Sequence, residues 1–427
     1  MAAFFPYLVF MAWLAVFAWL WTRPAILNWS GLSNSHILSF LLIKIMAGIV
    51  YTGMFMNVPE WQTRVDTWRY FFQSLGETDW LLNDPKGFFA DLATPRYAED
   101  SGLLGTHNSL LNDLKEVLVI KLMAISNLVT GRNIAANIVL FNGFTMAGQL
   151  VIARIWSKFF RVPMLWPAIL VLLWPSVLFW TSAFHRDGLM LHCLGISTWL
   201  IYTLWKQKTW KWWQAFFFFI HFGLLFFLRN YLALFFLASC GIAWLWAIGG
   251  NKRKLIWYAL LAVFAGLWLT GKILPQYHLP SILLDRQEAF KALSGGSLVT
   301  PVLHDADWFH LVSSLPVALY RGFLAPFFHS GMKLLEWPAA FESLVLILAF
   351  AAFLFWLRKN NLGRNARAWL ILAVTLSVSI CLITGFTIPY AGAIVRYRSI
   401  VLPFFAPLLL FPLLPAAWKK TASMNTL

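Results

Sequence analysis

An acid, a base and a phenol lie within one short segment, Asp66-Thr67-Trp68-Arg69-Tyr70. At helical spacing Asp66 and Arg69 form a local ion pair, which contributes only about 0.2–0.5 kcal/mol to helix stability. The same carboxylate, placed at a membrane surface, has the chemistry of a general base that takes a proton from an acceptor hydroxyl. The spacing leaves both interpretations open.

A second ionisable group, His185-Arg186-Asp187, follows Ser182 in a short polar turn between two apolar stretches. Asp187 is suited to cap the next helix by accepting hydrogen bonds from its free backbone amides. A helix N-terminus beside a guanidinium is also a natural anion site. Structural and functional roles are about equally well supported by the sequence.

Three further arginines lie next to apolar stretches. Arg229 stands alone between two of them, and Arg396-Tyr397-Arg398 precedes the last one. Arginines in such places commonly contact lipid headgroups. Bidentate binding of a phosphate or carboxylate is the alternative, because a guanidinium presents a planar fork of donors.

No metal-binding motif, glycine-rich phosphate loop or serine-nucleophile motif is present. His304 and His310, with Asp305 and Asp307 nearby, are best read as surface-loop residues, because no second set of ligands accompanies them. The sequence predicts no metal-binding residue and leaves a divalent cation open as a cofactor.

The elements that must position these residues are membrane helices. The chain of 427 residues is 60% hydrophobic and only 12% charged, whereas soluble domains carry about 25% charged residues. The net charge of +16 is spread over short basic connections between apolar stretches, which is typical of cytoplasmic loops rather than of a nucleic-acid surface. The sequence therefore predicts an all-α integral membrane protein that does not bind nucleic acid.

Apolar runs of sufficient length predict about eleven transmembrane helices. These are residues 4–22, 38–56, 133–155, 164–181, 188–205, 213–228, 230–249, 255–272, 340–358, 367–387 and 399–417. The basic connections then lie in the cytoplasm, and two large extracytoplasmic regions follow: a first outer loop (residues 57–132) and a second outer loop (residues 273–339). We expect one polytopic membrane domain over residues 1–427, with residues 110–131 as an amphipathic helix in the interface.

The combination resembles the GT-C superfamily of multi-pass glycosyltransferases, which use sugars carried on polyprenyl phosphate. The resemblance is carried by Asp66 in Asp-x-x-x-Tyr, by Ser182 with Arg186 and Asp187, by Arg229 and by Arg396-Tyr397-Arg398. It covers the layout of most of the membrane domain, through short and degenerate motifs.

This resemblance implies an extracytoplasmic site, facing the periplasm or exterior of a bacterial inner membrane. Asp66 would be the base, and Asp187 would be the acid to test next. The implied partners are a polyprenyl-phosphate sugar, a glycan, lipid or protein acceptor, and the bilayer. The expected substrate-binding residues are Arg69, Tyr70, His185, Arg186, Arg229, Arg396, Tyr397 and Arg398.

Two other functions stay open. A polysaccharide polymerase or ligase would use a lipid-diphosphate donor and depend on its arginines rather than on Asp66. A lipid or sugar transporter would place ionisable groups at mid-membrane depth. Lys44 is the clearest charge inside a span, and we expect it near the cytoplasmic end, with its ammonium reaching the headgroups.

The predicted topology is tested by cysteine labelling in intact cells. Ala90→Cys and Thr300→Cys should react with a membrane-impermeant reagent, and Arg253→Cys should not, because only the first two lie in the predicted outer loops. The native Cys193, Cys240 and Cys381 lie inside predicted spans and serve as the background. Protection of position 90 would contradict the outer location of Asp66.

Overall fold

The protein is described by a computed structural model in which residues 5–56, 65–93, 110–160, 162–209, 211–249, 252–293, 297–328, 332–359 and 364–410 are placed. Over these residues the regular structure is helical, with no strand, which confirms the predicted all-α class. The described chain divides into a first unit that runs to Ala233 and a second unit that begins at Leu234. Parts of the first outer loop (57–64 and 94–109) and of the last predicted span (411–417) lie outside the described residues.

Seven described helices are long and apolar enough to cross a membrane. They are α3 (Asn34–Met56), α8 (Ile134–Phe160), α11 (Arg186–Gln207), α13 (Asn230–Ile248), α14 (Lys252–Ile273), α18 (Trp337–Lys359) and α19 (Arg364–Thr387). These lengths and compositions describe a multi-pass membrane protein.

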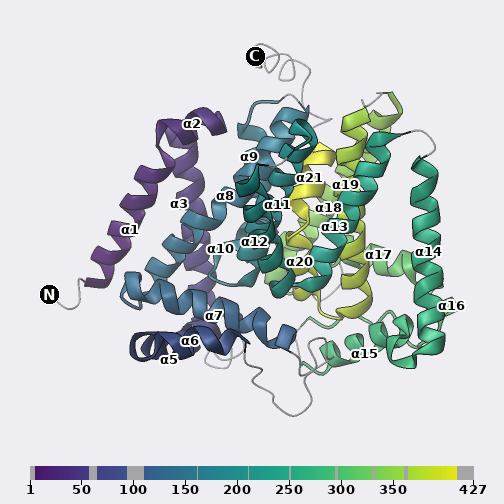
Figure 1. Cartoon of the computed structure of the whole chain (residues 1–427), viewed down its shortest axis with the longest axis horizontal. Coiled ribbons are helices and arrows are strands. Elements are labelled where there is room, and N and C mark those ends of the chain that lie inside the picture. The colour runs from purple at the N-terminus through teal and green to yellow at the C-terminus, as the bar shows by residue number, and fades with distance from the viewer. Residues whose placement is uncertain are drawn as a thin grey trace. The chain divides into compact units, whose positions relative to one another are not determined.

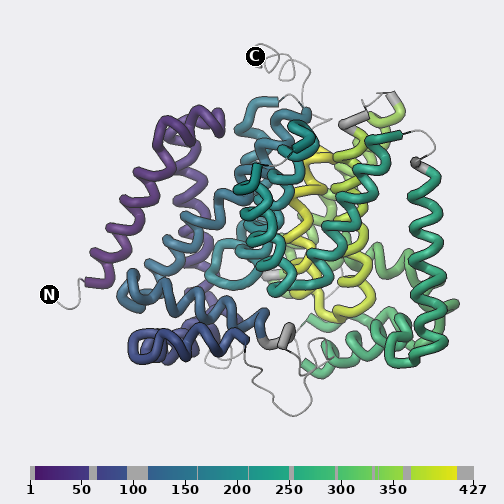
Figure 2. The backbone as a smooth tube through the Cα atoms, viewed as in Figure 1, coloured from purple at the N-terminus to yellow at the C-terminus, as the bar shows by residue number. Residues whose placement is uncertain are grey.

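Three pairs of described helices are bent at a short break, one of them within the predicted span 164–181. They are α1 (Phe5–Trp21) with α2 (Pro24–Ser30), α9 (Leu165–Leu172) with α10 (Pro175–Ser182), and α20 (Ala391–Ser399) with α21 (Leu402–Leu410). In α2 and α10 the second helix starts at a proline, which lacks the amide needed to continue the first. Figure 2 shows the chain passing from α1 through α2 into α3. Counting each pair once gives up to ten spans among the described residues, so the count of about eleven stays a prediction.

The first unit is centred on close packing between α8 and α11. A Cβ atom on Gly195 would lie 2.1 Å from the carbonyl oxygen of Gly148, and one on Gly148 would lie 2.4 Å from the Cα of His192. Apolar side chains gain little from association inside lipid, so small residues that let backbones approach are what hold such helices together. The close approach of the two helix backbones therefore requires glycine at positions 148 and 195.

A layer of polar helices lies across the ends of α3 and α8 in the first unit (Figure 1). It consists of α5 (Asp66–Asn83), α6 (Pro85–Ala90), the short η1 (Asp91–Ala93) and α7 (Leu110–Thr130). Asn127 on α7 donates to Ser74 and Thr78 on α5, at 2.9 and 3.1 Å. Helix α7 is not among the described helices that qualify as spans, and its place in the membrane interface stays a prediction.

Completing the first unit, α12 (Trp212–Leu228) packs on α11 and α7. In the second unit, the predicted second outer loop contains η2 (Pro275–Tyr277), α15 (Leu279–Lys291), α16 (Trp308–Ser313), α17 (Leu315–Leu324) and η3 (Leu334–Glu336). Helices α15 and α17 both pack on α19. The side chain of Gln287 also holds the following segment, accepting from the amides of Val302 and Leu303 at 2.9 and 3.0 Å.

The close α8–α11 contact predicts a large difference between two glycine substitutions. Gly195→Ala should lower stability by about 1–3 kcal/mol, because the new methyl group meets backbone and not a movable side chain. Gly223→Ala is the matched control on α12, since no heavy atom lies within 4 Å of its Cβ position. It should gain up to about 1 kcal/mol of helix propensity. Thermal unfolding of the purified protein in detergent measures both, and equal stability of the two variants would contradict the packing.

Candidate functional site

Asp66 opens α5 and lies between two arginines from distant parts of the chain. Its Oδ1 is 3.5 Å from an Nη of Arg69, and its Oδ2 is 3.7 Å from an Nη of Arg186, the first residue of α11. Its side chain is 15% exposed, so it is sheltered but reachable. Both contacts are longer than the hydrogen bonds of a tight ion pair.

Arg69 joins this carboxylate to a second one. It lies 3.0 Å from Oε2 of Glu116 on α7. Burial disfavours the charged guanidinium, but Glu116, with further contributions from Tyr70 and Asp66, outweighs this effect and raises the pKa of Arg69 above its ordinary value. Asp66, Arg69, Glu116 and Arg186 form what we call the carboxylate–arginine cluster.

The turn that presents Arg186 is held by polar side chains from inside the bundle. Lys44 on α3 is completely buried, with its ammonium 3.2 Å from Oγ of Ser182 and 3.4 Å from Oγ1 of Thr181. Asn142 on α8 donates to the carbonyl of Ser182 at 2.6 Å. Helix α10 ends at Ser182, so the ammonium of Lys44 lies at its negative end, where a cation is stabilised.

The prediction that Lys44 reaches the lipid headgroups is wrong. Its side chain has no exposed surface, because Thr181 and Ser182 accept its hydrogen bonds inside the first unit. No described carboxylate lies within ion-pair distance of it. A charged residue with hydroxyl partners within a membrane helix bundle marks a place of functional interest.

His185 and Asp187 are also completely buried, directly beside the exposed end of Arg186. Nδ1 of His185 lies 3.2 Å from Oδ2 of Asp187 and 3.3 Å from its backbone amide. A protonated Nδ1 donates to the carboxylate, whereas a deprotonated one accepts from the amide and caps α11. The contacts of this pair stabilise the turn before α11. Asp187 is buried and is not part of the partly exposed surface that carries Asp66.

Tyr70 and Arg229, the other candidates of the first unit, each take part in a contact between a guanidinium and an aromatic ring. Tyr70 is buried, and the guanidinium carbon of Arg69 lies 5.3 Å from the centre of its ring. Arg229 follows the last residue of α12, is 8% exposed, and lies 5.6 Å from the ring of Tyr231. Both rings place a guanidinium within cation–π distance.

The arginine pair of the second unit lies on α20 and divides into two environments. Arg398 is buried and lies 3.2 Å from Oε1 of Glu342 on α18, and it also donates to the carbonyls of Phe323 and Ala325. Through these contacts, its guanidinium links the C-terminal end of α17 to α18. Arg396 and Tyr397 are half-buried on the same helix, and Tyr397 packs on the cluster of Ala325, Ile388 and Ile394.

The structure thus brings together Asp66, Arg69 and Arg186, three of the residues that the sequence singled out. Glu116 is the member that sequence reasoning missed, whereas Lys44, which holds the turn before Arg186, was singled out but misplaced. Glu116 had a visible signal, since it interrupts an otherwise apolar helix. The described residues contain no group of three or more His, Cys, Asp or Glu side chains arranged to hold a metal ion.

Comparisons with protein-family models, with curated proteins and with solved structures find no match for this chain. The chemistry must therefore be argued from the cluster. It offers a sheltered carboxylate as a proton acceptor and two guanidiniums as partners for developing negative charge.

The buried pair of Arg398 and Glu342 predicts a strong effect on stability. Glu342→Gln should destabilise the protein by about 3–5 kcal/mol, because it leaves a buried guanidinium without its counter-charge. Glu288→Gln is the control in the same unit: its pair with Lys291 is about half exposed and should contribute at most about 1 kcal/mol. Denaturant unfolding in detergent measures the difference, and similar losses in the two variants would show that Arg398 does not depend on Glu342.

Proposed function

We propose that this protein is a membrane glycosyltransferase that moves a sugar from a polyprenyl-phosphate-linked donor to an acceptor hydroxyl, with Asp66 as the general base. The observation that carries the proposal is the contact of Asp66 with both Arg69 and Arg186. It places one proton acceptor and two fixed positive charges together in a layer of polar helices beside a bundle of apolar ones.

The reaction needs few groups from the protein. Asp66 takes the proton of the acceptor hydroxyl, and the hydroxyl oxygen forms a bond to the anomeric carbon of the donor sugar. The bond from that carbon to the phosphate oxygen breaks, and its electron pair leaves on the lipid phosphate. Arg186 and Arg69 offset the charge that develops there. A lipid phosphate is already a good leaving group, so no strong general acid is required.

The remaining arginines differ in how well they suit phosphate binding. Arg398 is committed to Glu342 and to backbone carbonyls, so we assign it to the fold. Arg229 and Arg396 keep the role of candidate phosphate contacts, because a guanidinium near the membrane surface suits a lipid phosphate. We place the site on the extracytoplasmic face, in a bacterial inner membrane, from the distribution of basic connections in the sequence.

One observation favours a second candidate, a transporter of lipids or sugars. Lys44 is fully buried within a helix that qualifies as a span, and transporters use ionisable groups at such depths. The two functions separate cleanly in detergent, where no membrane divides the solution. Release of free lipid phosphate from a polyprenyl-phosphate sugar then requires transferase chemistry and cannot come from transport.

Substitution of the proposed base is the central test. Asp66→Asn keeps the shape of the side chain but cannot accept a proton at neutral pH, so turnover should fall by about 10²–10⁴-fold. Donor binding should persist, because Arg186 and Arg69 are unchanged. The measurement is single-turnover release of lipid phosphate from a panel of polyprenyl-phosphate sugars.

Asp79→Asn is the matched control, since Asp79 lies on the same helix with a more than half-exposed side chain paired with Arg132. It should keep nearly full activity. Near-normal turnover in Asp66→Asn, with loss in another carboxylate variant, would refute Asp66 as the base. If no carboxylate matters, a polymerase or ligase that depends on arginines becomes the better interpretation.

A further inference from the structure

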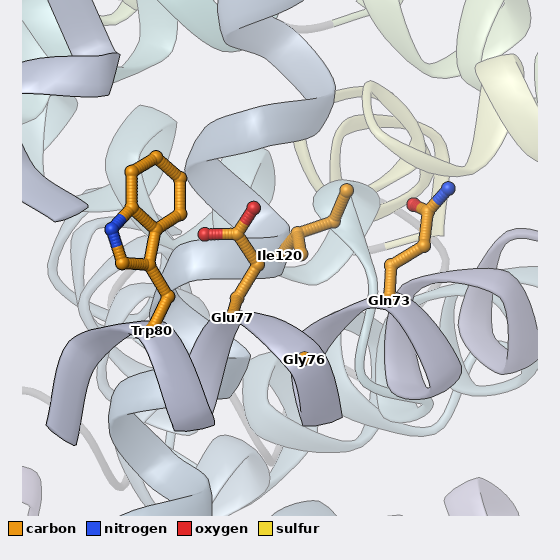
Figure 3. Close-up of a pocket in the computed structure, with 5 residues that line it drawn as sticks. All are labelled: Gln73, Gly76, Glu77, Trp80 and Ile120. Carbon is orange, nitrogen blue, oxygen red and sulfur yellow. The ribbon is translucent and has the colours of Figure 1, made fainter. Parts of the chain in front are cut away.

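A pocket of about 240 Å³ lies between α5 and α7, away from the carboxylate–arginine cluster. It is lined by Gln73, Gly76, Glu77, Trp80 and Ile120. Figure 3 shows the side chains of Gln73, Glu77 and Trp80 rising from the same side of α5, with Ile120 between Gln73 and Glu77. Pockets for drug-sized ligands measure about 300–1,000 Å³, so this one suits a smaller group, about the size of one sugar ring.

The pocket lies on the same face of α5 as the proposed base. Asp66, Arg69, Gln73, Glu77 and Trp80 follow one another at intervals of three or four residues, which places them in one stripe along the helix. At a rise of about 1.5 Å per residue, Glu77 lies roughly 16 Å from Asp66 along the helix axis. Glu116 and Ile120, one helical turn apart on α7, lie beside Arg69 and beside the pocket.

The polar groups of the pocket come from one side chain that is fixed by an ion pair and one that is exposed. Glu77 is fixed by Lys121 at 2.9 Å, and Lys121 is itself held by Asp91 at 3.1 Å and lies over the ring of Trp80 at 4.5 Å. Gln73 is exposed, and its amide makes no hydrogen bond to the rest of the described chain. An amide supplies both donors and an acceptor, and a fixed carboxylate accepts from hydroxyl groups.

The charge of the pocket decides which substrate it suits. The carboxylate of Glu77 lines it, while the ammonium of Lys121 is 3% exposed and taken up by two carboxylates. A lipid phosphate would meet uncompensated negative charge here, whereas a neutral hydroxyl-rich ring would meet an amide, a carboxylate and an aromatic side chain. The chemistry therefore favours the acceptor side of the reaction over the donor.

We propose that this pocket is an acceptor subsite, which binds an interior ring of a neutral glycan whose terminal hydroxyl lies at Asp66. The proposal rests on the proposed transferase function and names the acceptor class: a neutral glycan long enough to extend about 16 Å along α5. A single sugar would reach Asp66 without reaching the pocket.

The test compares two tryptophan substitutions, one that fills the pocket and one on the opposite face of the same helix. Gln73→Trp introduces a bulky ring into the pocket. Leu82→Trp introduces the same ring on the other side of α5, because nine residues at about 100° each place Leu82 opposite Gln73, and Leu82 is 61% exposed. The probes are neutral hexose oligosaccharides of one to four units with the purified full-length protein.

Binding is read first by ligand-observed NMR saturation transfer, without a donor. Wild type and Leu82→Trp should transfer saturation to interior rings of the tetrasaccharide, and Gln73→Trp should not. With a donor present, the ratio of tetrasaccharide KM to monosaccharide KM should rise about tenfold or more in Gln73→Trp and stay unchanged in Leu82→Trp.

The two proposals fail in different ways. Absence of interior-ring saturation in wild type, or equal binding in Gln73→Trp and wild type, overturns the acceptor subsite even if Asp66 proves to be the base. Interior-ring binding that is lost only in Gln73→Trp supports the subsite. If Asp66→Asn then turns over normally, the pocket still binds glycans and the assignment of the base is what fails.

Discussion

Burial of the Lys44 ammonium is the constraint on which the candidate site depends. An ammonium inside an apolar bundle loses its hydration, and here the hydroxyls of Thr181 and Ser182 replace part of it. Those hydroxyls belong to the last turn of α10, directly before the turn that begins α11. Holding that turn against α3 fixes the direction in which Arg186 leaves the bundle, and Arg186 reaches Asp66 from there. A contact in the bundle core thus determines the geometry of a partly exposed carboxylate.

Two of the buried cations among the described residues, Arg398 and Lys44, differ in what they contribute. Arg398 has a carboxylate partner, Glu342, and also donates to the carbonyl of Ala325 and the hydroxyl of Ser343, so it links helices within the second unit. Lys44 has only neutral acceptors at hydrogen-bonding distance among the described residues. Well-packed apolar side chains often replace buried charges without loss of stability. A cation kept without a counter-charge is therefore better explained by what it positions than by the stability that it adds.

The sequence predicted the helical class and pointed to three charged residues of the cluster, because both signals are local. Apolar run length predicts membrane helices, and Asp66, Arg69 and Arg186 stood out as charges next to such runs. Pairing between distant segments was not predictable. The predicted location of the Lys44 side chain was wrong because its partners, Thr181 and Ser182, are far away in the sequence. The predicted span 164–181 is a bent pair of helices, since hydropathy alone does not show where a proline breaks a helix.

The carboxylate–arginine cluster has a consequence for the proposed reaction. Two carboxylates and two guanidiniums balance in charge, so the cluster is satisfied before any substrate binds. In the proposed reaction, a lipid phosphate that enters beside Arg186 would compete with Asp66 for that guanidinium, because their 3.7 Å contact is longer than a hydrogen bond. Asp66 then loses part of its positive surroundings and becomes a stronger proton acceptor. Donor binding would in this way prepare the base, and a proton would be taken from the acceptor only when the leaving group is in place.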